Sequence, residues 1–68
     1  FDDVLSINLH ESLLNADIEL IDEFGRILRA MRASQQVLKI STENIKPGLL
    51  LLRITSHNAV YVHKIIKK

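Results

Sequence analysis

The sequence predicts an all-β fold, a small immunoglobulin-like antiparallel β-sandwich of about six to seven strands. Short segments in which apolar and polar residues alternate, the period of a half-buried strand, recur along the chain. Residues that favour tight turns separate these segments. The composition agrees, because 47% of the 68 residues are apolar and none is cysteine. Such a fold depends on an aliphatic core and not on disulfides.

The first strand is expected over residues 4–10, whereas residues 17–31 are ambiguous from their pattern alone. Their apolar residues recur at helical spacing, with Asn15 placed as a possible N-cap. However, Gly25 would cost a helix about 1 kcal/mol. Asp22 and Gly25 also stand at the first and fourth positions of a type I turn, around which many hairpin loops are built. The pattern therefore leaves helix and hairpin open.

A further strand is expected over residues 37–41, and Pro47 and Gly48 predict a type II turn after it. Proline presets the first central backbone angle of that turn, and glycine accepts the positive angle at the second. The next segment, residues 49–55, does not alternate in its first half. Either both of its faces are buried, or one apolar face awaits a partner.

The last strand is expected over residues 60–68, after a tight turn at residues 56–59 in which Asn58 can take a left-handed conformation. Together the strands predict which apolar residues supply much of the core. These are Ile7, Leu9, Ile18, Leu20, Leu38, Ile40, Leu52, Ile54 and Val62.

Charge is divided unevenly along the chain. Seven of the eight carboxylates lie within residues 2–23, and all nine Lys and Arg residues lie from Arg26 onward. This asymmetry can mark a nucleic-acid or membrane surface. Strands of opposite charge that face each other across a sheet explain it more simply. Since the net charge is only +1 and there is no row of aromatic residues, we do not expect nucleic acid as a partner.

Residues that could carry catalysis or bind a metal are sparse. His10, His57 and His63 are the only imidazoles, and none stands at a metal-ligand spacing from another. Nothing resembles a nucleophile elbow, a phosphate loop or a pair of catalytic carboxylates. A β-domain of this size also has little room for a pocket that excludes water. We therefore expect neither an enzyme nor a bound metal or cofactor.

Three motifs, in their order along the chain, resemble the C-terminal sorting domain of proteins exported by the type IX secretion system of Gram-negative bacteria, also called the Por secretion system. The first is a hairpin around the turn Asp22-Glu23-Phe24-Gly25-Arg26. The second is the segment Ile45 to Ile54, in which Pro47-Gly48 opens a leucine-rich strand. The third is the lysine-terminated strand Val62 to Lys68. The resemblance covers nearly the whole chain and favours the hairpin over the helix.

The resemblance implies an address and not a catalyst. Domains of this family are carried on unrelated cargo proteins and are recognised by the outer-membrane translocon and its shuttle protein. A cysteine-protease sortase commonly removes them and joins the cargo to an anionic lipopolysaccharide. The cargo would thus pass through the periplasm and the outer membrane to the medium or the cell surface. Because Phe1 is not an initiator Met, we expect residues 1–68 to be a single domain of a longer secreted protein.

For translocon recognition we single out Lys64, Lys67 and Lys68, displayed by the last strand, together with the turn Pro47-Gly48. A free strand edge could be recognised by strand addition, in which main-chain hydrogen bonds give affinity and the lysines give register. The same edge could allow self-association. An alternative is that the lysines only protect the edge from aggregation.

Asp22, Gly25 and Arg26 are expected to have a structural role in the hairpin turn. For the domain as a whole, the competing hypothesis is an immunoglobulin-like accessory or adhesion module of a cell-surface protein.

Overall fold

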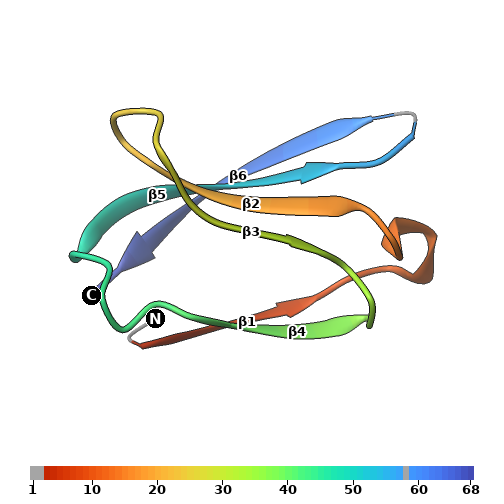
Figure 1. Ribbon diagram of the computed structural model, residues 1–68, viewed down its shortest axis with the longest axis horizontal. Helices are drawn as coiled ribbons and strands as arrows, with labels where there is room; N and C mark the ends of the chain where they lie inside the picture. The colour runs from red at the N-terminus through yellow and green to blue at the C-terminus, as the bar shows by residue number, and fades with distance from the viewer. Residues whose placement is uncertain (1–2, 58) are drawn as a thin grey trace.

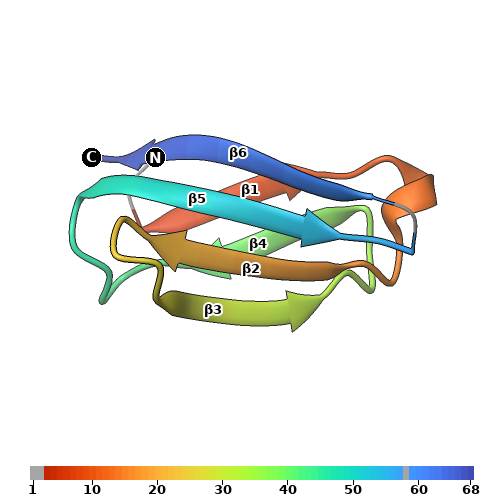
Figure 2. The ribbon, with the colours of Figure 1, turned by 90° about the horizontal axis from the view of Figure 1, so that it is seen from above.

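Two antiparallel sheets pack face to face in the computed structural model, which describes residues 3–57 and 59–68 (Figure 1). The smaller sheet pairs β1 with β4, and the larger has the strand order β3-β2-β5-β6. Figure 2 shows the larger sheet from above, with the smaller sheet beneath it. The predicted all-β sandwich is confirmed. Its elements are β1 (Val4–Asn8), the 3₁₀ turn η1 (Glu11–Leu13), β2 (Asp17–Asp22), β3 (Ile27–Arg32), β4 (Val37–Ser41), β5 (Gly48–Thr55) and β6 (Val60–Lys67).

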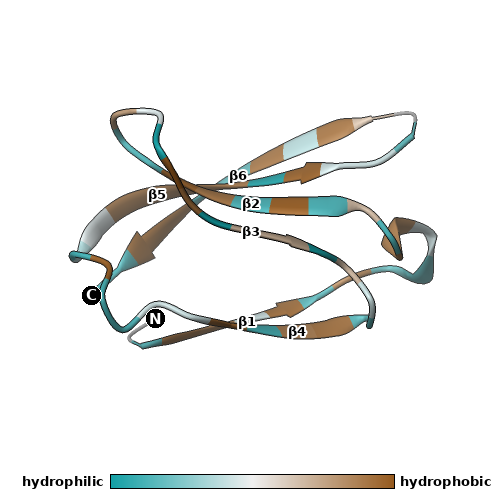
Figure 3. Cartoon of the chain, viewed as in Figure 1, coloured by the Kyte–Doolittle hydropathy of each residue, from teal (hydrophilic) through white to brown (hydrophobic). Residues whose placement is uncertain are grey.

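The ambiguous segment 17–31 forms the β2–β3 hairpin and not a helix. Ile18 lies opposite Met31 and Leu20 opposite Arg29, with a register shift after Leu20. Residues two apart in a strand share a face, so Ile18 and Leu20 both point into the core. The alternation of apolar and polar residues along β2 is visible in Figure 3.

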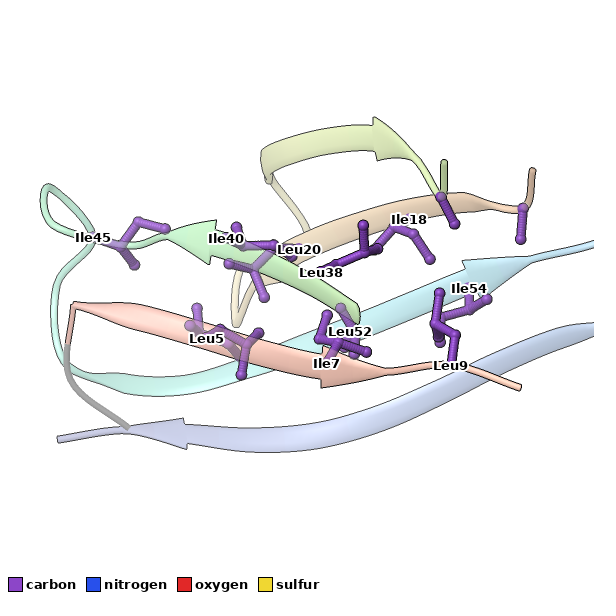
Figure 4. Close-up of a cluster of buried hydrophobic side chains, with 13 residues drawn as sticks. Leu5, Ile7, Leu9, Ile18, Leu20, Leu38, Ile40, Ile45, Leu52 and Ile54 are labelled. Carbon is purple, nitrogen blue, oxygen red and sulfur yellow. The ribbon is translucent and has the colours of Figure 1, made fainter. Parts of the chain in front are cut away.

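The core lies between the two sheets and is aliphatic (Figure 4). Its most deeply buried large apolar side chains, at 2% exposed or less, are Ile18, Leu20, Ile40 and Leu50. All of the predicted core residues are buried except Val62, for which the prediction was wrong because its side chain is 55% exposed. Val62 lies opposite Arg53 on the outer face of the edge strand β6, whereas Ile65 of the same strand packs against the core.

The leucine-rich start of β5 has one face in the core. Leu50 and Leu52 are buried, while Leu49 on the outer face is 38% exposed. The connection from β4 to β5 differs from the prediction. Its hydrogen-bonded turn spans residues 42–45, and Gly48 is already the first residue of β5, with a φ of +141°. A type II turn needs about +80° at its glycine, so Pro47 and Gly48 do not form the predicted turn.

Opposite charges face each other across the larger sheet, as the charge asymmetry predicted. Glu19 of β2 lies directly opposite Arg53 of β5, and the Oε1 and Nη2 atoms are 2.6 Å apart. Asp17 and Arg32 pair across β2 and β3 at 3.7 Å.

The turn expected at residues 56–59 includes Asn58, which lies outside the described residues. Among the described residues, no helix is long and apolar enough to cross a membrane.

Candidate functional site

One end of the sandwich gathers four parts of the chain that are distant in sequence. The start of β1, the β2–β3 turn, the β4–β5 connection and the end of β6 all lie there (Figures 1 and 2). Most of the residues predicted for recognition or for turn structure belong to these parts. The candidate site therefore lies at this end.

The β2–β3 turn is held by the carboxylate of Asp22. Its Oδ1 accepts hydrogen bonds from the main-chain N–H groups of Phe24 and Arg26, both at 2.9 Å, and its Oδ2 accepts one from Arg26 Nε at 2.8 Å. Gly25 has a φ of +83° and donates its N–H to the Asp22 carbonyl. Desolvation raises the pKa of Asp22, but the hydrogen bonds from Arg26 and Phe24 outweigh it and hold that pKa below its usual range. Asp22, Gly25 and Arg26 thus form a locally self-supporting turn.

A hollow of about 360 Å³ lies between this turn and residues 44–50. Its lining includes Phe24 and Arg26 from the turn and Lys46, Pro47 and Leu49 from the other side. Phe24 is 75% exposed, and the guanidinium carbon of Arg26 lies 5.5 Å from its ring centroid. Apolar surface therefore meets three cations, Arg26, Arg29 and Lys46, and two carboxylates, Asp22 and Glu23, at one opening.

Arg29 donates to the main-chain carbonyls of Ser41 and Leu28, whereas Arg26 and Lys46 keep donors available for a ligand. Arg26 uses Nε on Asp22 and leaves its terminal amino groups without a partner in the described part of the chain. Its side chain is 72% exposed. Lys46 likewise makes no ion pair or hydrogen bond with any residue that the structure describes. This end of the sandwich therefore presents charged donors of the kind that pair with carboxylates, next to apolar surface.

Lys67 is not displayed, so this part of the prediction was wrong. Only 5% of Lys67 is exposed, and its Nζ donates to the main-chain carbonyl of Thr42 and, at 2.6 Å, to that of Ile45. The Oδ1 atom of Asp3 is 3.9 Å away. The cause is the two-residue period of β6: Lys67 shares the inward face with Ile65, which packs against the core.

Lys64 and Lys68 are exposed, and neither lines the hollow. The structure thus brings Asp22, Arg26, Pro47 and Gly48 together around the hollow. Lys67 does not line the hollow itself, but it donates a hydrogen bond to Ile45, which does. The structure leaves Lys64 and Lys68 on the outside of the molecule.

Sequence reasoning missed Phe24, Lys46 and Leu49 as members of this site. Phe24 carried a signal, since a large aromatic side chain in the middle of a polar turn has no core to enter. Lys46 and Leu49 carried none, because only the fold places them beside Phe24.

The described residues contain no group of three or more His, Cys, Asp or Glu side chains that could hold a metal ion. The hydrogen bond of His10 Nδ1 to Ser12 Oγ, 2.9 Å long, is local to η1.

Comparison with known proteins identifies the family. No curated protein matches the chain. A family model described as "Secretion system C-terminal sorting domain" matches residues 1–68, the whole chain. This match confirms the resemblance that rested on three motifs. The chain therefore belongs to the family of C-terminal sorting domains of the type IX secretion system.

Proposed function

We propose that the domain, as a member of this family, is a C-terminal sorting signal that directs its cargo to the type IX translocon for passage across the outer membrane. The translocon or its shuttle protein binds the end of the sandwich that carries the hollow. The observation that carries this proposal is that two of the family-like motifs, the Asp22–Arg26 turn and the Pro47–Gly48 segment, line one hollow.

The chemistry of the hollow suggests what it binds. Phe24 and Leu49 supply exposed apolar surface, and beside it Lys46 and the terminal amino groups of Arg26 supply donors that no described residue uses. A partner segment with an apolar side chain next to a carboxylate would satisfy both. Asp22 does not oppose such a segment, because Arg26 and two main-chain N–H groups already compensate its charge. Glu23 also lines the hollow and is exposed, so the partner's carboxylate would have to lie on the side of Arg26 and Lys46.

The edge strand β6 offers a second contact. Among the described residues it has one strand neighbour, β5, so a partner strand could add along its other side. Lys64 and Lys68 would then fix the position of that strand by charge. Self-association through the same edge would compete with this contact.

The later steps of the proposal rest on the family resemblance. After export, a cysteine-protease sortase would remove the domain and join the cargo to an anionic lipopolysaccharide. The cargo would then remain on the cell surface, or reach the medium if it is not attached. The route runs through the periplasm of a Gram-negative bacterium.

The test is a reporter protein that carries an export signal for the periplasm and residues 1–68 at its carboxyl end. In a bacterium with a working type IX system, we expect the reporter on the surface or in the medium. In a strain that lacks the translocon, and for a reporter without the domain, we expect it to stay in the periplasm. Equal export with and without the translocon would show that the domain is not a type IX signal.

A further inference from the structure

Lys67 is the only charged side chain that is buried among the described residues. Lysine is almost never buried without partners, and here the partners are carbonyl groups of the chain between β4 and β5. The Nζ atom donates to Thr42 and Ile45, and Asp3 at 3.9 Å supplies the nearest carboxylate. An ammonium group has three donors on a flexible stem, so it suits a cluster of acceptors contributed by different segments.

The acceptors belong to a tightly tied turn. Thr42 is fully buried, its N–H donates to the Asp3 carbonyl at 2.7 Å, and its own carbonyl accepts from the Ile45 N–H at 3.0 Å. Lys67 therefore joins the end of β6 to a turn that is already joined to the start of β1. From the opposite edge of the large sheet, Arg29 of β3 donates to the Ser41 carbonyl at 3.1 Å.

This turn leads directly into one wall of the hollow. Ile45 lines the hollow, as do Lys46, Pro47 and Gly48 after it. Gly48 is also the strand partner of Lys67 across β5 and β6. Lys67 thus contacts this wall in two ways. It donates a hydrogen bond to Ile45 at the start of the wall, and it pairs with Gly48 at the end of the wall as a strand partner.

We propose that Lys67 is a positioning residue, which holds residues 42–48 in place and thereby sets the shape of the hollow. The end of β6 would then matter for recognition through a buried contact, while its exposed lysines make a separate contribution. The link to recognition rests on the proposed function, whereas the effect of Lys67 on the turn does not.

The test compares Lys67→Met with Lys64→Met and Lys68→Met, all in the chain fused to a folded reporter. Methionine keeps an apolar stem of similar length and removes the donors, and the two controls change lysines that are exposed.

Hydrogen exchange is measured by mass spectrometry for residues 42–50 and for β2. In Lys67→Met we expect exchange in residues 42–50 to rise by about tenfold or more, with β2 nearly unchanged, because loss of local contacts opens a segment and not the domain. Lys67→Gln, which keeps one amide donor group, should lie between Met and wild type.

Two results would overturn the positioning role: exchange of residues 42–50 that is unchanged in Lys67→Met, or exchange that rises equally in β2, which would show general unfolding. Export of the Lys67→Met fusion is then measured against that of a Lys39→Met fusion, because Lys39 is exposed on β4 and does not line the hollow. We expect a several-fold loss for Lys67→Met and normal export for Lys39→Met. Localised exchange with normal export would leave the effect on the turn intact and overturn its link to recognition. If the wild-type fusion is not exported at all, the proposed function fails while the exchange result stands.

Discussion

Replacing Gly48 by alanine isolates the energetic effect of one backbone angle. Gly48 opens β5 with a φ of +141°, and a Cβ added there would meet no atom within 4 Å. The cost of Gly48→Ala therefore comes from the backbone and not from a clash. A side chain held in such a region costs about 1 to 3 kcal/mol. In a domain of this size each kcal/mol corresponds to about 4 to 8 °C, so we expect the Tm to fall by about 4 to 24 °C.

The sign of the change is informative, because alanine at a compatible position stabilises a protein by about 0.4 to 1 kcal/mol. Thermal unfolding followed by circular dichroism measures it. Gly25 is the matched control, since it also has room for a Cβ but has a φ of +83°. That angle lies nearer the left-handed region, which asparagine tolerates. Asparagine should therefore be less harmful than alanine at Gly25 but not at Gly48. A Tm that is unchanged or raised in Gly48→Ala would refute the reasoning.

Further predictions concern the core, the turn and the exposed lysines. Leu20→Ala should lower the free energy of unfolding, measured by denaturant titration, by about 2 to 5 kcal/mol because Leu20 is fully buried. Val62→Ala should change it by no more than about 0.5 kcal/mol. Equal effects of the two substitutions would contradict the assigned core. Because the pKa of Asp22 is lowered in the folded state, its ionised form stabilises the fold above its unfolded-state pKa, and this contribution is lost as the pH falls through the folded pKa. The Tm advantage of wild type over Asp22→Asn should therefore shrink between pH 7 and pH 3, measured by thermal scans, and a constant difference would disprove the role of the charge. Lys64→Ala and Lys68→Ala should each leave the free energy of unfolding within about 0.5 kcal/mol of wild type, and a larger loss would show that these exposed lysines support the fold.

The fold class could be predicted because each strand carries its own signal. Alternation placed Ile7 and Ile40 in the core, and the Asp22–Gly25 spacing marked the hairpin turn. The hairpin itself needed the family resemblance, since the apolar residues of the segment also fit a helix. Val62 was misplaced because the sequence of β6 does not show which of its two faces is turned to the core, and Val62 lies on the outer face, opposite Arg53.

The site could be predicted only in part, because it depends on which segments meet in space. Lys67 was grouped with Lys64 and Lys68 by charge. Because Ile65 and Ile66 place an apolar residue on each face of β6, alternation alone does not show that Lys67 is on the inward face. The carbonyl groups that accept its donors are main-chain atoms of Thr42 and Ile45. Main-chain acceptors leave no mark in the side-chain sequence, so their contact with a lysine far along the chain required the structure.

Two arginines of the same hairpin give the most direct test of the claim that the sorting signal is recognised at the end with the hollow. Arg26 and Arg32 are both 72% exposed, and each pairs with an aspartate of β2, at 2.8 Å and 3.7 Å respectively. Arg26 lines the hollow, whereas Arg32 lies at the opposite end of β3. The measurement is the extracellular fraction of the reporter fused to Arg26→Gln or Arg32→Gln, with the Tm of each fusion recorded to exclude unfolding. We predict a several-fold loss of export for Arg26→Gln and normal export for Arg32→Gln. Equal export of the two variants would contradict recognition at this end of the sandwich.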